Sequence, residues 1–186
     1  MRVIAGKLKS RQLKSVDSKL TRPTTDKNKE NLFNMIGPYF EGGRCLDLFA
    51  GSGGLGIEAI SRGMDELYSV DKQYRAFLTI QHNIKTLGIE NQVHVYKLDY
   101  SKALLKLAQE QVSFHLVLLD PPYQMKIHQK ILDFLVEHHM LCDQCIIVIE
   151  DLKEEAIDVK EPFVLKKQQN YGITSLQILV YKEKKS

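Results

Sequence analysis

Residues 47–56 read DLFAGSGGLG and directly follow the apolar pair Cys45 and Leu46. Four glycines fall within the six positions from 51 to 56. Glycine reaches backbone conformations that are closed to other residues and lets a ligand approach the main chain closely. A glycine-rich turn between a strand and a helix is typical of ligand-binding loops in doubly wound sheets. The stretch therefore predicts the first β-α unit of such a sheet, with a ligand site at its edge.

Five short apolar runs, the first of which leads into this stretch, are separated from one another by a helix-like pattern. The runs lie at residues 45–49, 67–70, 93–96, 115–119 and 145–149. Short continuous apolar runs are typical of buried parallel strands. Two more extended runs, 163–165 and 173–181, are too close together for a crossover helix, so they predict an antiparallel hairpin. The expected fold is α/β, a doubly wound, mostly parallel sheet that ends in an antiparallel hairpin.

The N-terminal region differs in charge from the rest of the chain. Its first 30 residues hold nine Lys or Arg and three acids, a net charge of +6, whereas the whole chain carries +3. Alternation of apolar and polar residues predicts a short basic β-hairpin that turns near Gly6 or Ser10. After a polar linker, Thr24 or Thr25 can cap a helix that stops at Gly37. We therefore expect a hairpin and helix extension, residues 1–40, and a main domain, residues 41–186.

A basic arm of this kind suits a polyanion, because each phosphate that Lys or Arg neutralises releases a counterion. The alternative is a solvated terminal face. The candidate phosphate contacts in the arm are Lys7, Lys9, Arg11 and Lys14. Arg22 and Lys27 flank the predicted helix and could instead cover the ligand pocket of the main domain.

Composition excludes several classes of protein. With 186 residues, 44% of them hydrophobic, the chain has the size of one folded domain. We expect neither a membrane span nor a signal peptide, because no apolar run approaches about 20 residues and the N-terminus is basic and polar. The three cysteines, Cys45, Cys142 and Cys145, cannot make a disulfide framework and suit a reducing compartment. The expected location is the cytoplasm, and the expected state is a monomer.

Two ligand classes fit the glycine-rich loop. Gly51, Gly53 and Gly56 match the dinucleotide fingerprint, and Asp71 follows at the place of a ribose-binding acid, which favours NAD. However, Asp47 puts a carboxylate where a pyrophosphate would be repelled, and the chain has no room for a substrate domain. A zwitterionic cofactor with an ammonium group fits better.

Asp71 and Asp99 each follow a predicted strand at equivalent positions in successive units. A carboxylate after the second strand can accept both hydroxyls of a ribose, and one after the third can accept from an adenine amino group. Asp99 could equally serve only as the N-cap of the helix that starts at Tyr100.

The sequence Asp120-Pro121-Pro122-Tyr123 follows the most hydrophobic predicted strand. Two prolines stiffen the turn and remove two amide donors, so the loop presents carbonyl oxygens as acceptors. Together with Asp120, one such carbonyl can accept both protons of an exocyclic amine, and the Tyr123 ring can stack a flipped base. Holding both protons directs the nitrogen lone pair, which is catalysis by orientation and electrostatics.

The remaining motifs give weaker support for a function. Cys142 and Cys145 have CxxC spacing without a second pair, and His138 and His139 lack the spacing of a zinc-binding helix. We expect no metal site. Neither a GxxxxGK[ST] nor a GxSxG sequence is present.

DLFAGSG from position 47 followed by DPPY from position 120 resembles the class I S-adenosylmethionine-dependent methyltransferases that modify exocyclic amines of nucleobases. Four shorter matches resemble, more narrowly, the RsmD family of bacterial 16S ribosomal RNA guanine-N2 methyltransferases. They are VIAGK at 3–7, RPTTD at 22–26, LFN at 32–34 and YGIT at 171–174. Two positions depart from the family pattern: Lys27 stands where the family usually has Arg, and Gln73 where a second acid is common.

The resemblance implies methyl transfer from S-adenosylmethionine, which leaves S-adenosylhomocysteine, to the N2 amine of a guanine in 16S rRNA of the small ribosomal subunit. It implies that Asp47, Phe49, Ala50, Gly51, Gly53, Asp71, Lys72, Asp99 and Tyr100 bind the cofactor. It implies that Asp120, Pro121, Pro122 and Tyr123 form the catalytic loop, and that Lys7, Lys9, Arg11, Lys14, Arg22 and Lys27 contact RNA. Three alternatives remain: a DNA adenine or cytosine amine methyltransferase, an NAD-dependent dehydrogenase, and a non-catalytic RNA-binding protein.

Overall fold

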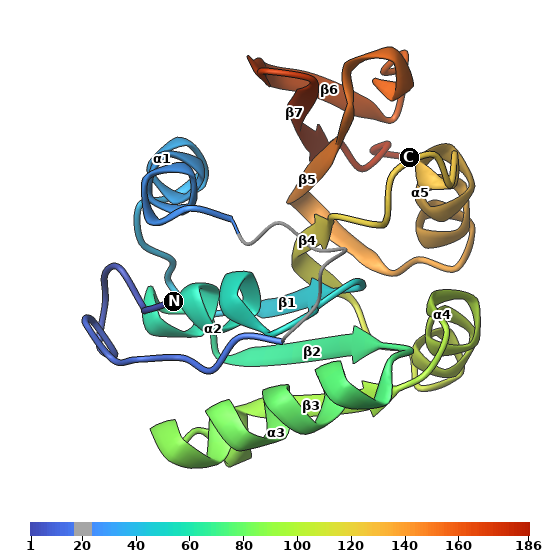
Figure 1. Cartoon of the computed structure of the whole chain (residues 1–186). Coiled ribbons are helices and arrows are strands. Elements are labelled where there is room, and N and C mark those ends of the chain that lie inside the picture. The colour runs from blue at the N-terminus through green and yellow to red at the C-terminus, as the bar shows by residue number, and fades with distance from the viewer. Residues whose placement is uncertain (17–23) are drawn as a thin grey trace.

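The computed structural model describes residues 1–16 and 24–186, and its centre is a seven-stranded sheet in the order β3-β2-β1-β4-β5-β7-β6 (Figure 1). The strands are β1 (Arg44–Asp47), β2 (Glu66–Asp71), β3 (Val93–Lys97), β4 (Phe114–Leu119), β5 (Leu141–Leu152), β6 (Phe163–Tyr171) and β7 (Thr174–Tyr181). The pairs among β1 to β5 are parallel, whereas β7 is antiparallel to both β5 and β6. The predicted doubly wound sheet with a terminal antiparallel hairpin is confirmed.

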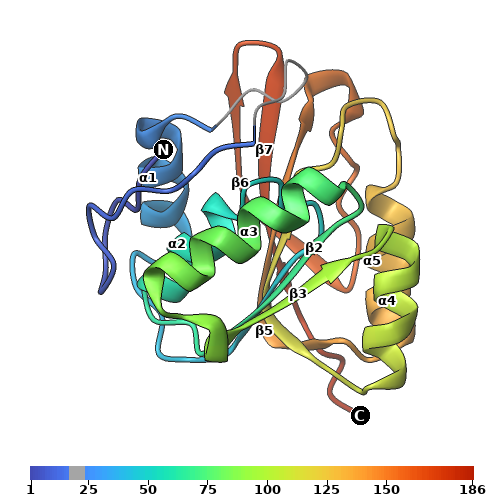
Figure 2. The same cartoon turned by 60° about the horizontal axis from the view of Figure 1, so that its bottom comes forward.

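Helices cover both faces of the sheet and make three layers (Figure 2). One face carries α1 (Asp26–Ile36), α2 (Gly54–Ser61) and α3 (Tyr74–Leu87), and the other carries α4 (Tyr100–Gln109) and α5 (His128–Glu137). Two short 3-10 helices, η1 (Glu90–Gln92) and η2 (Lys153–Glu155), lie in connections. Each face has its own buried apolar cluster, because alternate residues of a strand point to opposite faces. The described residues contain no helix that is both long and apolar enough to span a membrane.

The N-terminal arm, defined as residues 1–16, is less regular than the predicted β-hairpin. It has one isolated antiparallel bridge, between Arg2 and Gln12, and no regular strand. The reason is that its backbone groups also bond to the main domain: Lys7 N donates to the Ser61 carbonyl at 2.9 Å and Leu8 N to the Ser61 hydroxyl at 2.9 Å. At Gly6, with φ +86°, a Cβ would lie 1.9 Å from the Ser61 oxygen, so this turn requires glycine.

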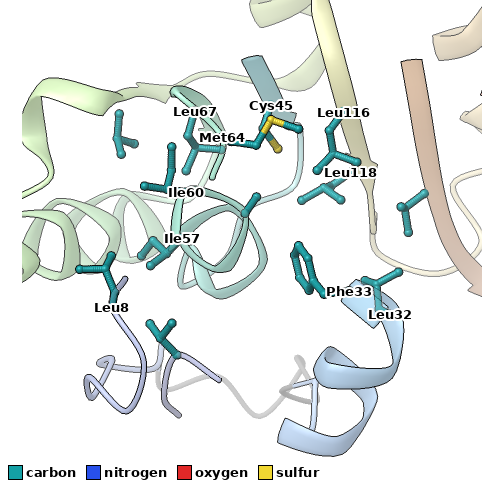
Figure 3. Packing of buried hydrophobic residues seen from close by; sticks show 14 of the residues in the cluster. Leu8, Leu32, Phe33, Cys45, Ile57, Ile60, Met64, Leu67, Leu116 and Leu118 are labelled. Atoms are coloured by element: carbon teal, nitrogen blue, oxygen red, sulfur yellow. The ribbon is translucent and has the colours of Figure 1, made fainter. Parts of the chain in front are cut away.

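The arm and α1 share the hydrophobic cluster of the sheet. Helix α1 begins after Thr25, whose hydroxyl accepts from Asn28 N at 3.2 Å and supplies the predicted cap. Figure 3 shows Leu8 of the arm and Phe33 of α1 in one cluster with the α2 side chain Ile57. Removing these apolar side chains from water holds both N-terminal elements on the main domain.

A buried ionic cluster joins the arm, α1 and α2. Glu58 on α2 has no exposed surface and accepts hydrogen bonds from Ile4 N at 2.9 Å, Ala5 N at 3.1 Å and Arg62 Nε at 2.8 Å. Lys29 of α1, also buried, lies 3.7 Å from the Glu58 carboxylate. Burial lowers the pKa of Lys29, and the Glu58 carboxylate opposes that shift. One carboxylate therefore fastens three elements that are distant in sequence.

Candidate cofactor and amine-binding site

The predicted acidic residues gather at one edge of the sheet. Asp47 and Asp71 are the last residues of β1 and β2, Asp99 follows β3 within two residues, and Asp120 directly follows β4. These four strands are parallel, so their carboxyl ends lie at the same edge. Ligands of open α/β sheets bind at this edge.

The glycine loop, defined as residues 50–53, connects β1 to α2. Gly51 and Gly53 have φ values of +58° and +84°, and Gly53 is the N-cap of α2. A Cβ at Gly51 would meet no atom within 4 Å, so the main chain borders open space there. Asp71 holds the loop, because one of its carboxylate oxygens accepts from Gly51 N at 2.9 Å and the other from Gln73 N at 2.9 Å. The structure thus brings together two residues of the predicted cofactor set, Gly51 and Asp71.

Asp47 lies beneath this loop with 2% of its surface exposed. Burial, reinforced by the charge of Asp71, raises the pKa of Asp47 to about 7, although backbone hydrogen bonds from Phe49 and Gly56 act in the opposite direction. A cation placed beside Asp47 would favour its ionised form. The site therefore suits a ligand that carries an ammonium group.

The structure confirms that Asp99 caps α4. Its Oδ1 accepts from Ser101 N at 3.0 Å and from the Ser101 hydroxyl at 2.7 Å, and the hydroxyl bond is the main cause of its lowered pKa. Both bonds use the same oxygen. The positive charge of Lys72 also lowers the pKa of Asp99, which places these two predicted residues near each other.

Two aromatic residues of the predicted cofactor set lie together near this cap. The ring centroids of Phe49 and Tyr100 are 5.6 Å apart, at an interplanar angle of 41°. Phe49 comes from the connection after β1, whereas Tyr100 is the first residue of α4. The pair therefore links the first and third β-α units and provides an aromatic surface beside Asp99.

The Asp120 loop, defined as residues 120–127, connects β4 to α5. Asp120 is half-buried, Pro121 is buried, and Tyr123 is 48% exposed. Burial raises the pKa of Asp120 well above its usual value, and the charges of Glu150, Asp47 and Asp151 raise it further. A carboxylate that readily holds a proton suits a group that first accepts a hydrogen bond and then the proton itself.

Three residues near this loop were not predicted. His128 Nε2 lies 2.8 Å from Asp151 Oδ2, and both side chains are buried. Burial lowers the pKa of His128, which favours its neutral form. The pair fastens the start of α5, and so the end of the Asp120 loop, to β5, while Glu150 acts on Asp120 through its charge. Glu150 and Asp151 follow the apolar run 145–149, and this strand-end position was the available signal.

The predicted basic residues differ in their surroundings. Lys7 Nζ donates to Gln92 Oε1 at 2.8 Å and Arg11 to the Thr86 carbonyl at 3.0 Å, so a phosphate would share or replace these partners. Lys9, Lys14 and Lys27 are exposed. Arg22 lies outside the described residues. Within residues 1–16 and 24–186 no group of three or more His, Cys, Asp or Glu side chains is placed to hold a metal ion.

The strand order, the glycine loop after β1 and the antiparallel β7 between β5 and β6 define the fold of class I methyltransferases. The family model described as "Conserved hypothetical protein 95" matches residues 1–180. The chain belongs to this family and is an RsmD-family methyltransferase.

Two curated relatives extend over almost the whole chain. The "Putative rRNA methyltransferase YlbH" of Bacillus subtilis is 44% identical over 185 residues, which cover 99% of this chain and 100% of the relative. The "Ribosomal RNA small subunit methyltransferase D" of Haemophilus influenzae is 33% identical over 178 residues, 96% of this chain and 92% of the relative.

Solved structures agree with this assignment. The "Putative methyltransferase yhhF from Escherichia coli" is 27% identical, with a TM-score of 0.85 and 99% coverage of both chains. An RNA methyltransferase from Salinibacter ruber in complex with S-adenosyl-L-homocysteine is 17% identical, with a TM-score of 0.65, covering 89% of this chain and 97% of that one; it shares the fold.

Proposed function

We propose that this enzyme transfers the methyl group of S-adenosylmethionine to the exocyclic N2 amine of a guanine in 16S rRNA of the small ribosomal subunit. The observation that carries the proposal is the position of the Asp120 loop. It offers a carboxylate and donor-free prolines at the same sheet edge as the glycine loop and Asp47. The name of the Haemophilus influenzae relative supports small-subunit rRNA as the substrate.

The residues at the sheet edge fit the cofactor. Asp47 would face its ammonium group, the open space at Gly51 would admit its methionine part, and Asp71 would accept from the ribose hydroxyls. Asp71 keeps acceptor capacity for this role, because each carboxylate oxygen has two lone pairs and each uses one for a backbone amide. The free Oδ2 of Asp99 would accept from the adenine amine, because its two described bonds use Oδ1. Bound S-adenosylmethionine supplies an electrophilic methyl group.

The Asp120 loop would prepare the amine for attack. Asp120 and the Pro121 carbonyl would accept its two N–H groups, and the exposed Tyr123 ring would stack the base. The new C–N bond leaves the nitrogen with one proton too many. Asp120 would take that proton, which its raised pKa favours.

Two experiments test the proposal. Nucleoside mass spectrometry of rRNA from a deletion strain should show loss of N2-methylguanosine from the small subunit. Loss of N6-methyladenosine instead would favour an adenine methyltransferase. Isothermal titration should detect binding of S-adenosylhomocysteine to the protein. Binding of NADH but not of S-adenosylhomocysteine would overturn the cofactor assignment. RNA affinity without any methyl transfer would indicate a binding protein.

A further inference from the structure

Asn83 on α3 joins the end of the N-terminal arm to the glycine loop. Its side chain is 1% exposed. Its Oδ1 accepts from Lys14 N at 2.8 Å, and its Nδ2 donates to the carbonyls of Lys14 and Ser52, both at 3.0 Å. One buried amide thus bonds twice to the arm and once to the centre of the loop.

A second bond joins the same two segments directly. Val16 N donates to the Ser52 hydroxyl at 2.9 Å. Ser52 is therefore held through its carbonyl by Asn83 and through its hydroxyl by the arm. Its neighbours in the loop, Gly51 and Gly53, have no side chains that could anchor them. These bonds and the bond from Gly51 N to Asp71 hold the loop in place.

The bonds have a mechanical consequence. Displacing residues 14–16 would leave the buried amide of Asn83 without two of its three partners, and an unpaired buried polar group is costly. The arm and the glycine loop should therefore become ordered together. The candidate phosphate contacts Lys7, Lys9 and Arg11 lie in the same arm, upstream of this junction.

We propose that Asn83 is a positioning residue that couples RNA contact by the arm to cofactor binding at the glycine loop. This inference rests on the proposed function, because it assumes that the loop holds the cofactor and the arm the RNA. Coupling between two binding sites is reciprocal, so RNA on the arm and cofactor at the loop each strengthen the binding of the other.

Amide hydrogen exchange measured by NMR tests the coupling without RNA. In the unmodified protein, saturating S-adenosylhomocysteine should slow exchange of the Lys14 and Val16 amides by about 5-fold or more, the lower end of typical coupling. The amide of Gly51, which lies in the loop itself, should also be slowed. Unchanged exchange at Lys14 and Val16 together with slowed exchange at Gly51 would overturn the coupling and leave the proposed function intact.

Two variants cut the connection at different bonds. Asn83→Ala removes the bridging amide, and Ser52→Ala removes only the bond to Val16 N. In both variants S-adenosylhomocysteine should still slow exchange of the Gly51 amide. It should slow exchange less at the amide that lost its partner, which is Lys14 in Asn83→Ala and Val16 in Ser52→Ala. If Asn83→Ala fails to fold, Ser52→Ala still tests the connection between the arm and the loop, because it deletes only the hydroxyl of a half-buried residue. Asn91→Ala, an amide deletion at an exposed position, is the matched control and should behave like the unmodified protein.

Titration with 16S rRNA transcribed in vitro tests the reciprocal effect. Saturating RNA should increase the affinity for S-adenosylhomocysteine by about 5-fold or more in the unmodified protein and in Asn91→Ala, and by less in Asn83→Ala. A purely structural role would lower the affinity equally with and without RNA, which would contradict the proposal. Failure to bind S-adenosylhomocysteine at all would instead overturn the proposed function.

Discussion

At the scale of single residues, the carboxylates at the sheet edge carry different tasks because their surroundings differ. Asp71 has both oxygens bonded to backbone amides, of Gly51 and Gln73, which makes it part of the loop's framework. Asp47 is buried and Asp120 half-buried, and both lie near other acids. Desolvation and these neighbouring charges raise the pKa of each. Residues of one chemical type thus divide into one that anchors the glycine loop and two whose pKa is raised by their surroundings.

Asp120→Ala should lower kcat by about 100-fold, about 2.7 kcal/mol, the scale for one preorganised electrostatic partner. The affinity for S-adenosylhomocysteine should remain nearly unchanged, because Asp120 would act on the amine. Steady-state kinetics and isothermal titration provide the two values. Asp158→Ala removes an exposed carboxylate and serves as the control. If Asp120→Ala loses affinity for the cofactor but keeps its rate at saturating cofactor, Asp120 belongs to the cofactor pocket and not to the amine-binding part of the site.

Asp47 should make the ligand-free protein less stable as the pH rises. Its folded pKa of about 7 lies above the unfolded value of 3.8, so between those values the folded state binds more protons and stability falls with increasing pH. Between about pH 5 and about pH 8 the free energy of unfolding of the unmodified protein should fall by about 3 kcal/mol through Asp47, and urea unfolding measures this change. In Asp47→Asn this part of the fall should be absent. The same slope in the variant would assign the effect to another group.

At the scale of elements, the arm and α1 depend on one buried carboxylate as well as on apolar packing. Glu58 is the common partner of two arm amides, of Arg62 at the C-cap of α2 and of Lys29 of α1. Removing one member of a buried ionic cluster leaves the other charges buried without a partner. The resulting loss of stability exceeds the net stabilisation that the ion pairs provided.

Glu58→Ala should therefore lower the free energy of unfolding by about 3 to 5 kcal/mol. Urea unfolding followed by circular dichroism measures the change. Glu90→Ala, at an exposed position in η1, removes the same group and should cost far less. Equal stability of the two variants would show that apolar packing alone holds the arm.

At the scale of the whole molecule, the arm runs between the two edges of the sheet. Lys7 and Arg11 contact Gln92 and Thr86 on the amino-end side of the strands. Residues 14 and 16 instead bond to Asn83 and Ser52 beside the glycine loop. The arm carries Lys and Arg on the face of α1, α2 and α3, and the sheet edge carries the acids that surround the loops. The basic residues of the arm would attract the phosphates of a polyanion, whereas the acids at the sheet edge would repel them. An extruded base could then enter the acidic site while phosphates elsewhere on the same RNA contact the arm.

Replacing Lys7, Lys9, Arg11 and Lys14 with Gln should weaken RNA binding and flatten its dependence on the logarithm of salt concentration. The slope should change by up to about 0.7 to 0.9 per lost phosphate contact. Affinity for S-adenosylhomocysteine without RNA should remain, because Lys14 bonds to Asn83 through its backbone. Neutralising Lys166, Lys167, Lys184 and Lys185 changes the charge equally and is the control. An unchanged salt slope would mean that the arm is only a solvated face.

Much of the fold was predictable because its signals are local. Continuous apolar runs mark the buried parallel strands, and the short span between residues 165 and 173 leaves no room for a crossover helix. The glycine loop and the strand-end acids could be assigned to one edge, since parallel strands bring their carboxyl ends together. Which ligand atoms these residues contact stays a prediction.

Local sequence patterns were sufficient to predict the order of the β-α units, the edge at which the acids gather and the basic character of the arm. Which polar side chains join distant segments depends on how the elements pack. Asn83 and Lys14 are 69 positions apart, Glu58 and Ile4 are 54 apart, and His128 and Asp151 are 23 apart. A single polar residue within a helix carries no periodic signal, so its partner emerges only when packing brings the two together and burial makes an unpaired group costly.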